Sequence, residues 1–321
     1  MLATRALQGV VVAILVASFT FALVKLAPGD PIAEALDDPS VSPAIRAQWR
    51  TTAGLDQSTG VQLWRWLRNA ARADFGYAYS QHEPVRAVIA RALPYSVLLM
   101  GTAIAVSLVL GVALALWQAR RANTVADRIA GWLTMTGAAA PEAWVALVVL
   151  AVFALGTHLL PVGGAHDPLS SSTSLIPRAL DLAKHLVLPV LSIAVVTVGV
   201  VARHQRAALV AVAPEAFVDA ARSRGLAEGA VWRRHILRNA LGPLLTLIGL
   251  ALPSLAGGAV FIERIFGWPG LGYVATQAVS SRDAPLLAAC VMVGALLVFA
   301  GSLVADVLHA WLYPRSGHAD G

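Results

Sequence analysis

"EAFVDAARSRGLAEGAVWRRHILRN", residues 215–239, is a polar, arginine-rich stretch between two strongly hydrophobic runs. Pro214 and Glu215 are typical of a helix start, because proline fits the first turn and an acid interacts favourably with the positive end of the helix dipole. Gly225 can adopt the left-handed conformation that ends a helix. The stretch therefore predicts a short helix, a turn at Gly225 and a second helix that leads into the next hydrophobic run.

The first of these helices carries an apolar stripe formed by Phe217, Val218, Ala220 and Ala221. Ala220 and Ala221 are small enough to let another surface approach closely. A short amphipathic helix of this kind suits a groove on a partner protein. It equally suits the surface of the anionic inner leaflet of a membrane. The residues alone leave both interpretations open.

The composition around this stretch is that of a membrane protein. The 321 residues are 58% hydrophobic and 13% charged, whereas soluble domains carry about 25% charged residues. Crossing a bilayer takes about 20 predominantly apolar residues. We therefore predict an all-α polytopic membrane protein with six transmembrane helices, at 6–27, 94–117, about 132–160, 186–202, 240–262 and 286–312.

The distribution of positive charge predicts the orientation of these helices. With the N-terminus inside, the inner segments hold twelve arginines, whereas the short outer loops 161–185 and 263–284 hold four basic residues. Positive charge favours the cytoplasmic side, so both termini are expected there. The loop 28–93 is then extracytoplasmic, because loops of this length translocate regardless of charge. The net charge of +6 is spread between hydrophobic runs, which argues against nucleic-acid binding.

Two of the predicted membrane helices contain residues that interrupt a regular helix. Pro141 opens a new helical segment inside the third, with Glu142 in its first turn. Gly257 and Gly258 permit a kink or a close backbone contact in the fifth. Irregular membrane helices tend to line a pathway or an interface, so these four residues are candidates for a pathway or gate. Glu142 either caps its helix dipole or contacts the pathway.

The sequence offers no catalytic motif. It has neither an HExxH zinc site nor a GxSxG nucleophile elbow, and the one cysteine, Cys290, lies in an apolar run where we expect it to be packed. We therefore predict that the chain is not an enzyme and holds no cofactor or metal. The two lysines, Lys25 and Lys184, follow Val24 and Ala183, so no P-loop is present either. ATP-driven transport would need a separate ATPase; the alternative is a secondary, ion-coupled transporter.

Residues 219–238 resemble the EAA loop of the permease subunits of ABC importers. That pattern is Glu-Ala-Ala, three residues, Gly, nine residues and Ile-x-Leu-Pro, which Asp219, Ala220, Ala221, Gly225 and Leu237 follow. Asp219 replaces the glutamate, His235 the isoleucine and Arg238 the proline. With arginine in place of the proline, the segment "RHILRNALGP" resembles the dipeptide, oligopeptide and nickel branch of these permeases.

Further motifs support the same resemblance in the same order along the chain. They are "LAPGDP" at 26–31, "GLD" at 54–56, "DFG" at 74–76, "ERIFGWPGLG" at 263–272, "SRDAPLL" at 281–287 and Pro-Arg at 314–315. The resemblance therefore extends from residue 5 to about residue 315. Tyr313 departs from the aspartate that usually precedes the terminal Pro-Arg.

The resemblance implies a type I ABC importer permease with two parts, namely residues 1–93 (first membrane helix and long extracytoplasmic loop) and residues 94–313 (permease domain with the coupling loop at 214–238). It implies a second homologous permease subunit, two ATPases that carry ATP and magnesium, and an extracytoplasmic substrate-binding protein. The bacterial inner membrane is the implied location. The ATPase-coupling residues would be Glu215, Asp219, Ala220, Ala221, Gly225 and Leu237. Dipeptides, longer peptides, nickel chelates and glutathione all remain possible substrates.

Overall fold

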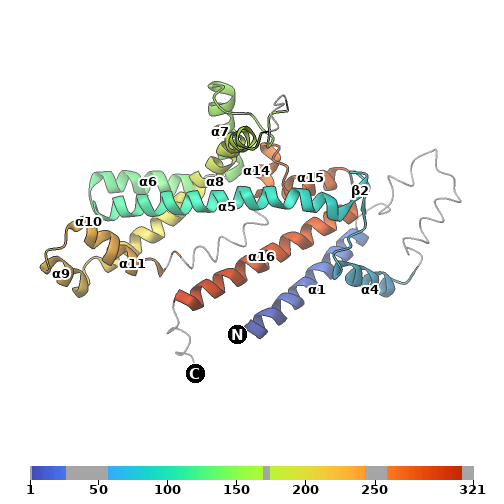
Figure 1. The fold of residues 1–321 in the computed structure, drawn as a ribbon, viewed down its shortest axis with the longest axis horizontal. Helices are drawn as coiled ribbons and strands as arrows, with labels where there is room; N and C mark the ends of the chain where they lie inside the picture. Colours follow the sequence, from blue (N-terminus) through green and yellow to red (C-terminus); the bar gives the residue numbers. More distant parts are fainter. Residues whose placement is uncertain (1, 27–56, 169–173, 243, 245–258, 313–321) are drawn as a thin grey trace. The chain divides into compact units, whose positions relative to one another are not determined.

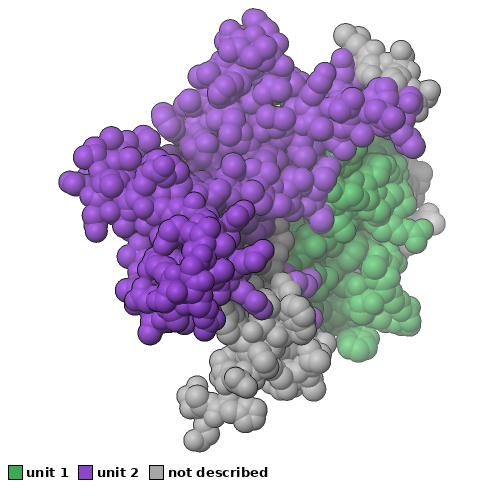
Figure 2. Space-filling model, turned by 60° about the vertical axis from the view of Figure 1, so that its left-hand side comes forward, with its two compact units in different colours: residues 1–96, 269–299 green, residues 97–268, 300–321 purple. Residues whose placement is uncertain are grey.

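The computed structural model describes residues 2–26, 57–168, 174–242, 244 and 259–312 (Figure 1). They form helices almost throughout, and they divide into two compact units (Figure 2). The first unit comprises residues 1–96 and 269–299, and the second comprises residues 97–268 and 300–321. Helices α5 (Val85–Ala119) and α16 (Ala284–Leu312) each contribute to both units.

The first unit contains helix α1 (Leu2–Leu26), helix α4 (Thr59–Ala70), a hairpin of β1 (Tyr77–Ala78) and β2 (Glu83–Pro84), the start of α5, helix α15 (Leu271–Ser280) and most of α16. The two short strands are antiparallel, with Tyr77 opposite Pro84. One apolar core joins these elements. Its buried members are Ala17, Phe75, Ala78, Val85, Val88, Ile89, Ala92, Leu271, Val274, Ala278, Leu286, Ala289, Cys290 and Met292.

A buried carboxylate fixes the hairpin to the start of α16. The backbone N–H and hydroxyl of Ser80 both donate to Oδ2 of Asp283, at 2.9 and 2.8 Å. The backbone N–H of Leu286 donates to Oδ1 of the same residue at 3.1 Å, which satisfies an otherwise unpaired donor of the first turn of α16. Asp283 is 2% exposed, so this cap is part of the core.

The second unit contains the rest of α5, helix α6 (Val125–Ala139), helix α7 (Glu142–Val149) continued by the π-helical turn η1 (Leu150–Gly156), and helix α8 (Leu175–Val212). Helix α6 packs along α8 (Figure 1). A Cβ on Gly199 of α8 would lie 2.3 Å from the carbonyl oxygen of Thr134 on α6. Glycine therefore lets the two backbones touch, as small residues do between membrane helices.

The remaining elements of the second unit are short. They are α9 (Ala216–Ser223), α10 (Glu228–Ala230), the π-helical turn η2 (Val231–Ile236), α11 (Leu237–Asn239) and α14 (Ala259–Ile265). Helices α9 to α11 follow the end of α8 and form the polar, arginine-rich stretch 215–239.

Among the described residues, α5, α8 and the Ala284–Val304 part of α16 are long and apolar enough to cross a membrane. The pair formed by α6 and α7–η1 is a fourth candidate, bent by 105°. The chain turns at Pro141, which precedes α7 and confirms the predicted helical segment that begins there. Helix α1 holds a shorter apolar stretch, Val11–Ala22. Most of the predicted fifth span, 240–262, including Gly257 and Gly258, lies outside the described residues.

Candidate functional site

Helix α9 packs one face against its own chain. Val218 is fully buried and Ala221 is 3% exposed, and the two residues are three positions apart on the same side of the helix. They belong to an apolar cluster, here called the α9 anchor. This cluster also contains residues of α5, of α8 and of the segment 231–240 that returns from α9, here called the returning segment. The members of the cluster are Ala115, Ala119, Leu209, Val218, Ala221, Val231, Ile236 and Ala240. Helix α9 is therefore packed directly on α5 and α8.

A neighbouring side of α9 is exposed. Phe217 is 41% exposed, and Ala220 and Arg224 are exposed as well. Because these three residues are three and four positions apart, they form one face, here called the α9 outer face. Of the two predicted small residues, Ala220 lies on this outer face, whereas Ala221 belongs to the anchor. The expectation that both alanines admit a partner stays a prediction for the exposed Ala220 and does not fit Ala221, because packing within its own chain buries Ala221.

The ends of α9 follow the sequence expectation. Glu215 precedes the helix in an extended conformation, and its carbonyl accepts from the N–H of Val218 at 2.8 Å. Gly225 has a φ of +78°, which confirms the predicted left-handed turn. A Cβ on Gly225 would have nothing within 4 Å, so the conformation of the turn alone requires glycine.

An arginine connects the two sides of this turn. Nε of Arg222 donates to Glu228 at 2.7 Å and Nη1 donates to Asp219 at 3.1 Å. The hydrogen bond to Glu228 raises the pKa of Arg222, and the bond to Asp219 adds to this effect. All three side chains are exposed, so water and salt screen these pairs and they add little to the stability of the turn. Asp219 is thus engaged within its own chain.

Leu237 lies in α11, half-buried, and packs against the α9 anchor. The structure therefore brings Glu215, Asp219, Ala220, Ala221, Gly225 and Leu237 into one small region. Behind it, the amide nitrogen of Gln205 on α8 donates to the carbonyl of Ala240 at 2.8 Å, in a buried hydrogen bond. This contact ties the returning segment to α8.

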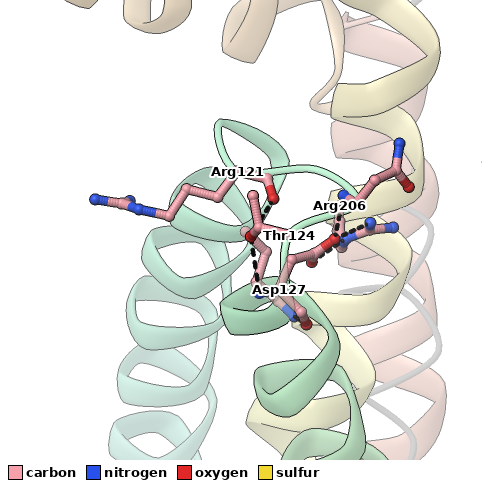
Figure 3. Close-up of polar contacts among 6 residues, drawn as sticks. Arg121, Thr124, Asp127 and Arg206 are labelled. Carbon is pink, nitrogen blue, oxygen red and sulfur yellow. Dashed lines mark hydrogen bonds and ion pairs between the residues drawn. The ribbon is translucent and has the colours of Figure 1, made fainter.

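The next residue of α8 forms a second tie, which sequence reasoning missed. Arg206 donates from Nε and Nη2 to the two carboxylate oxygens of Asp127 at 2.8 and 2.5 Å (Figure 3). Asp127 lies in the first turn of α6, and its carboxylate accepts a hydrogen bond from the backbone N–H of Asn123 at 3.0 Å. Its own N–H donates to Thr124 at 3.3 Å, so "TVAD" at 124–127 is a capping sequence that could have indicated a helix start.

The candidate pathway residues are only partly described. Glu142 occupies the first turn of α7 and is half-buried. The backbone N–H of Val145 donates a hydrogen bond to the carbonyl of Pro141 at 3.0 Å. The extended backbone of Ala140 and Pro141 forms the sharp break of the bent helix pair, and Glu142 begins the second helix. Their position relative to Gly257 and Gly258 falls outside the described residues.

Comparison with known proteins identifies the family. Residues 107–318 match the model of the binding-protein-dependent transport system inner membrane component, and residues 1–100 match the model of its N-terminal region. The oligopeptide transport system permease protein AppB of Bacillus subtilis is 32% identical over 97% of both chains. A putative peptide permease protein of Brucella ovis is 33% identical over 92% of both chains.

The glutathione transport system permease protein GsiC of Salmonella paratyphi A is 32% identical over 94% of this chain and 93% of its own. These likenesses extend over nearly the whole sequence, including the α9 region and the bent helix pair. The chain therefore belongs to the family of inner-membrane components of binding-protein-dependent transport systems.

Proposed function

We propose that this chain is a permease subunit of an ATP-driven ABC importer and forms half of the translocation pathway for peptides or a related small solute. The named relatives support the substrate class, since they are called oligopeptide, peptide and glutathione permeases. The other half of the pathway is a second, homologous permease subunit. An extracytoplasmic binding protein delivers the solute, and the chain itself has no catalytic role.

The proposed topology has six membrane helices in the bacterial inner membrane, with both termini in the cytoplasm. The excess of arginine in the segments 120–128 and 203–238 supports this orientation. It places α9 to α11 on the cytoplasmic side, where an ATPase can reach them. It also places the hairpin and α15 on the side from which the binding protein arrives.

The observation that carries the coupling role is the division of α9 into two faces. Val218 and Ala221 fix the helix to α5 and α8, while Phe217 and Ala220 remain exposed. The outer face fits a groove on an ATPase subunit, as amphipathic helices do in other complexes. Two such ATPases hold ATP and magnesium, since this chain has no P-loop.

ATP binding would then favour one of two arrangements of the membrane helices. A ligand shifts such an equilibrium only through a difference in its affinity for the two states. Closure of the ATPase pair would supply this difference by displacing α9 together with its anchor. The ties from Gln205 and Arg206 would extend the movement along α8 to the start of α6.

Co-purification followed by reconstitution tests this function. The chain is isolated in mild detergent from its own host, companions are identified by mass spectrometry, and uptake into liposomes is measured with and without ATP. We expect an ATPase, a second permease and peptide uptake that requires ATP and the binding protein. Uptake by the chain alone without ATP would instead establish the secondary transporter.

A further inference from the structure

Helix α4 has one face that its own chain leaves exposed. Trp64 is 67% exposed and Val61 is 44% exposed, and Arg65 and Arg68 are exposed beside them. These positions lie three or four residues apart, so they share one side of the helix. We call this side the α4 face. The opposite side packs against the core of the first unit through Trp66, Leu67 and Ala70.

Hydrogen bonds to α1 fix the position of α4 within the first unit. Nζ of Lys25, near the end of α1, donates to the hydroxyl of Thr59 at 2.7 Å. The indole Nε1 of Trp66 donates to the carbonyl of Ala17 at 3.0 Å. Ala17 precedes Lys25 by eight residues, which corresponds to about 12 Å along a helix. Helix α4 therefore lies alongside the last turns of α1 (Figure 1).

The apolar stretch of α1 locates α4 relative to the membrane. This stretch comprises Val11–Ala22, and the charged Lys25 follows it near the end of the helix. Ala17, whose carbonyl accepts from Trp66, lies inside the stretch, whereas Lys25, which donates to Thr59, lies just beyond it. Helix α4 therefore lies against the end of the apolar stretch, where apolar sequence gives way to polar sequence and where interfacial helices bind.

The chemistry of the α4 face matches that position. Tryptophan and arginine are the residues that anchor helices at the head-group level, because an aromatic ring or an alkyl chain lies against acyl chains while a polar group reaches outward. Arg65, Arg68 and the following Arg72 form a basic row, and the segment 59–73 contains no acid. Such a row is complementary to lipid phosphates.

We propose that the α4 face binds phospholipid head groups at the membrane interface and thereby holds α1 at a fixed depth. The occupant is the lipid bilayer, with phosphates at Arg65 and Arg68 and the boundary of the acyl chains at Val61 and Trp64. This role is independent of the proposed coupling to ATP, because it concerns the other unit of the chain.

The test places a fluorescent bimane label at position 64 through Trp64→Cys, in a Cys290→Ser background, in the complete transporter in nanodiscs. The nanodiscs contain phosphatidylethanolamine and phosphatidylglycerol with a nitroxide either near the head group or deep in the acyl chain. We expect quenching by the shallow nitroxide to exceed quenching by the deep one by about twofold or more. The quenching should be the same with and without the binding protein.

Two outcomes would overturn the proposal. Absence of quenching would show that the α4 face does not contact lipid, and quenching that disappears when the binding protein is added would show that it is a protein-docking surface. A paired variant extends the test. Arg65→Lys with Arg68→Lys should preserve the quenching depth, whereas Arg65→Glu with Arg68→Glu should weaken the shallow quenching. Equal quenching in both variants would contradict the phosphate contacts.

Discussion

Arg206 on α8 holds the buried carboxylate of Asp127 on α6 at two points, although 79 residues separate them in sequence. Asp127 is 4% exposed and Arg206 is 30% exposed at their side chains. Two parallel N–H···O bonds between an arginine and a carboxylate fix relative orientation as well as distance. The start of α6 is therefore held against the end of α8, next to the residue that bonds α8 to Ala240.

Removing either partner should destabilise the protein, because it leaves a charge without its partner in a largely buried site. Asp127→Asn and Arg206→Leu should each lower the free energy of unfolding in lipid–detergent micelles by about 3 kcal/mol. The double variant should cost clearly less than the two single costs combined. Arg203→Leu is the matched control, since Arg203 is exposed one turn earlier on α8. If the stability loss of the double variant equalled the sum of the two single losses, the two side chains would have no interaction energy.

The two neighbouring alanines of α9 should respond differently to the same enlargement. Ala221→Leu inserts atoms into the α9 anchor and should cost about 1–3 kcal/mol of folding stability. Ala220→Leu adds the same atoms to the exposed outer face, so stability should be unchanged while recovery of the ATPase with the chain falls. Thermal unfolding and co-purification yield distinguish the two effects. Normal ATPase recovery in the Ala220 variant would remove Ala220 from the docking surface.

Phe217 should be an anchor residue of the proposed contact with the ATPase. Truncating an aromatic hot-spot residue at the centre of an interface lowers the binding free energy by about 2 kcal/mol or more. This corresponds to about a 30-fold loss of affinity. We expect Phe217→Ser to weaken ATPase binding by about that factor in a pull-down titration, and Phe217→Leu to retain most of it. Since Phe217 is exposed, neither change should affect unfolding of the isolated chain. Unaltered affinity in the serine variant would argue for a membrane-surface helix.

Glu142 should act through the dipole of α7. A carboxylate in the first turn stabilises a helix by about 0.3–1 kcal/mol, so Glu142→Gln should lower stability by that amount. Uptake of cationic and neutral peptides should then change equally, which competition assays with the reconstituted importer can measure. A loss confined to cationic peptides would instead put Glu142 in the pathway.

The parts of the site that depend on local backbone preferences were predictable from the sequence. Gly225 readily adopts a positive φ and Pro141 has a fixed φ, so the turn after α9 and the start of α7 follow from residue identity. The inward direction of Ala221 was not predictable, because Phe217, Val218, Ala220 and Ala221 together cover a wide apolar arc. Only packing on Leu209 and Ala115 selects the buried side.

Contacts between distant segments were also beyond the sequence. The capping pattern of Thr124 and Asp127 marks the start of α6, yet nothing local to it indicates Arg206 as a partner. Likewise, the indole of Trp66 could be assigned to the head-group level by residue type, but its bond to Ala17 depends on how α4 folds back along α1. Such pairings depend on tertiary packing, which a single sequence does not reveal.

The most direct test of the coupling claim is uptake and ATP hydrolysis measured on the same proteoliposomes carrying Gly225→Val. Valine is strained at a φ of +78° by about 1–2 kcal/mol or more, so the turn should rearrange while the membrane helices remain intact. Gly229→Val is the control, because Gly229 has equal space and an ordinary helical backbone. We predict ATP hydrolysis without uptake for the Gly225 variant, and both activities for the Gly229 variant. Normal uptake with Gly225→Val would contradict the coupling role of α9.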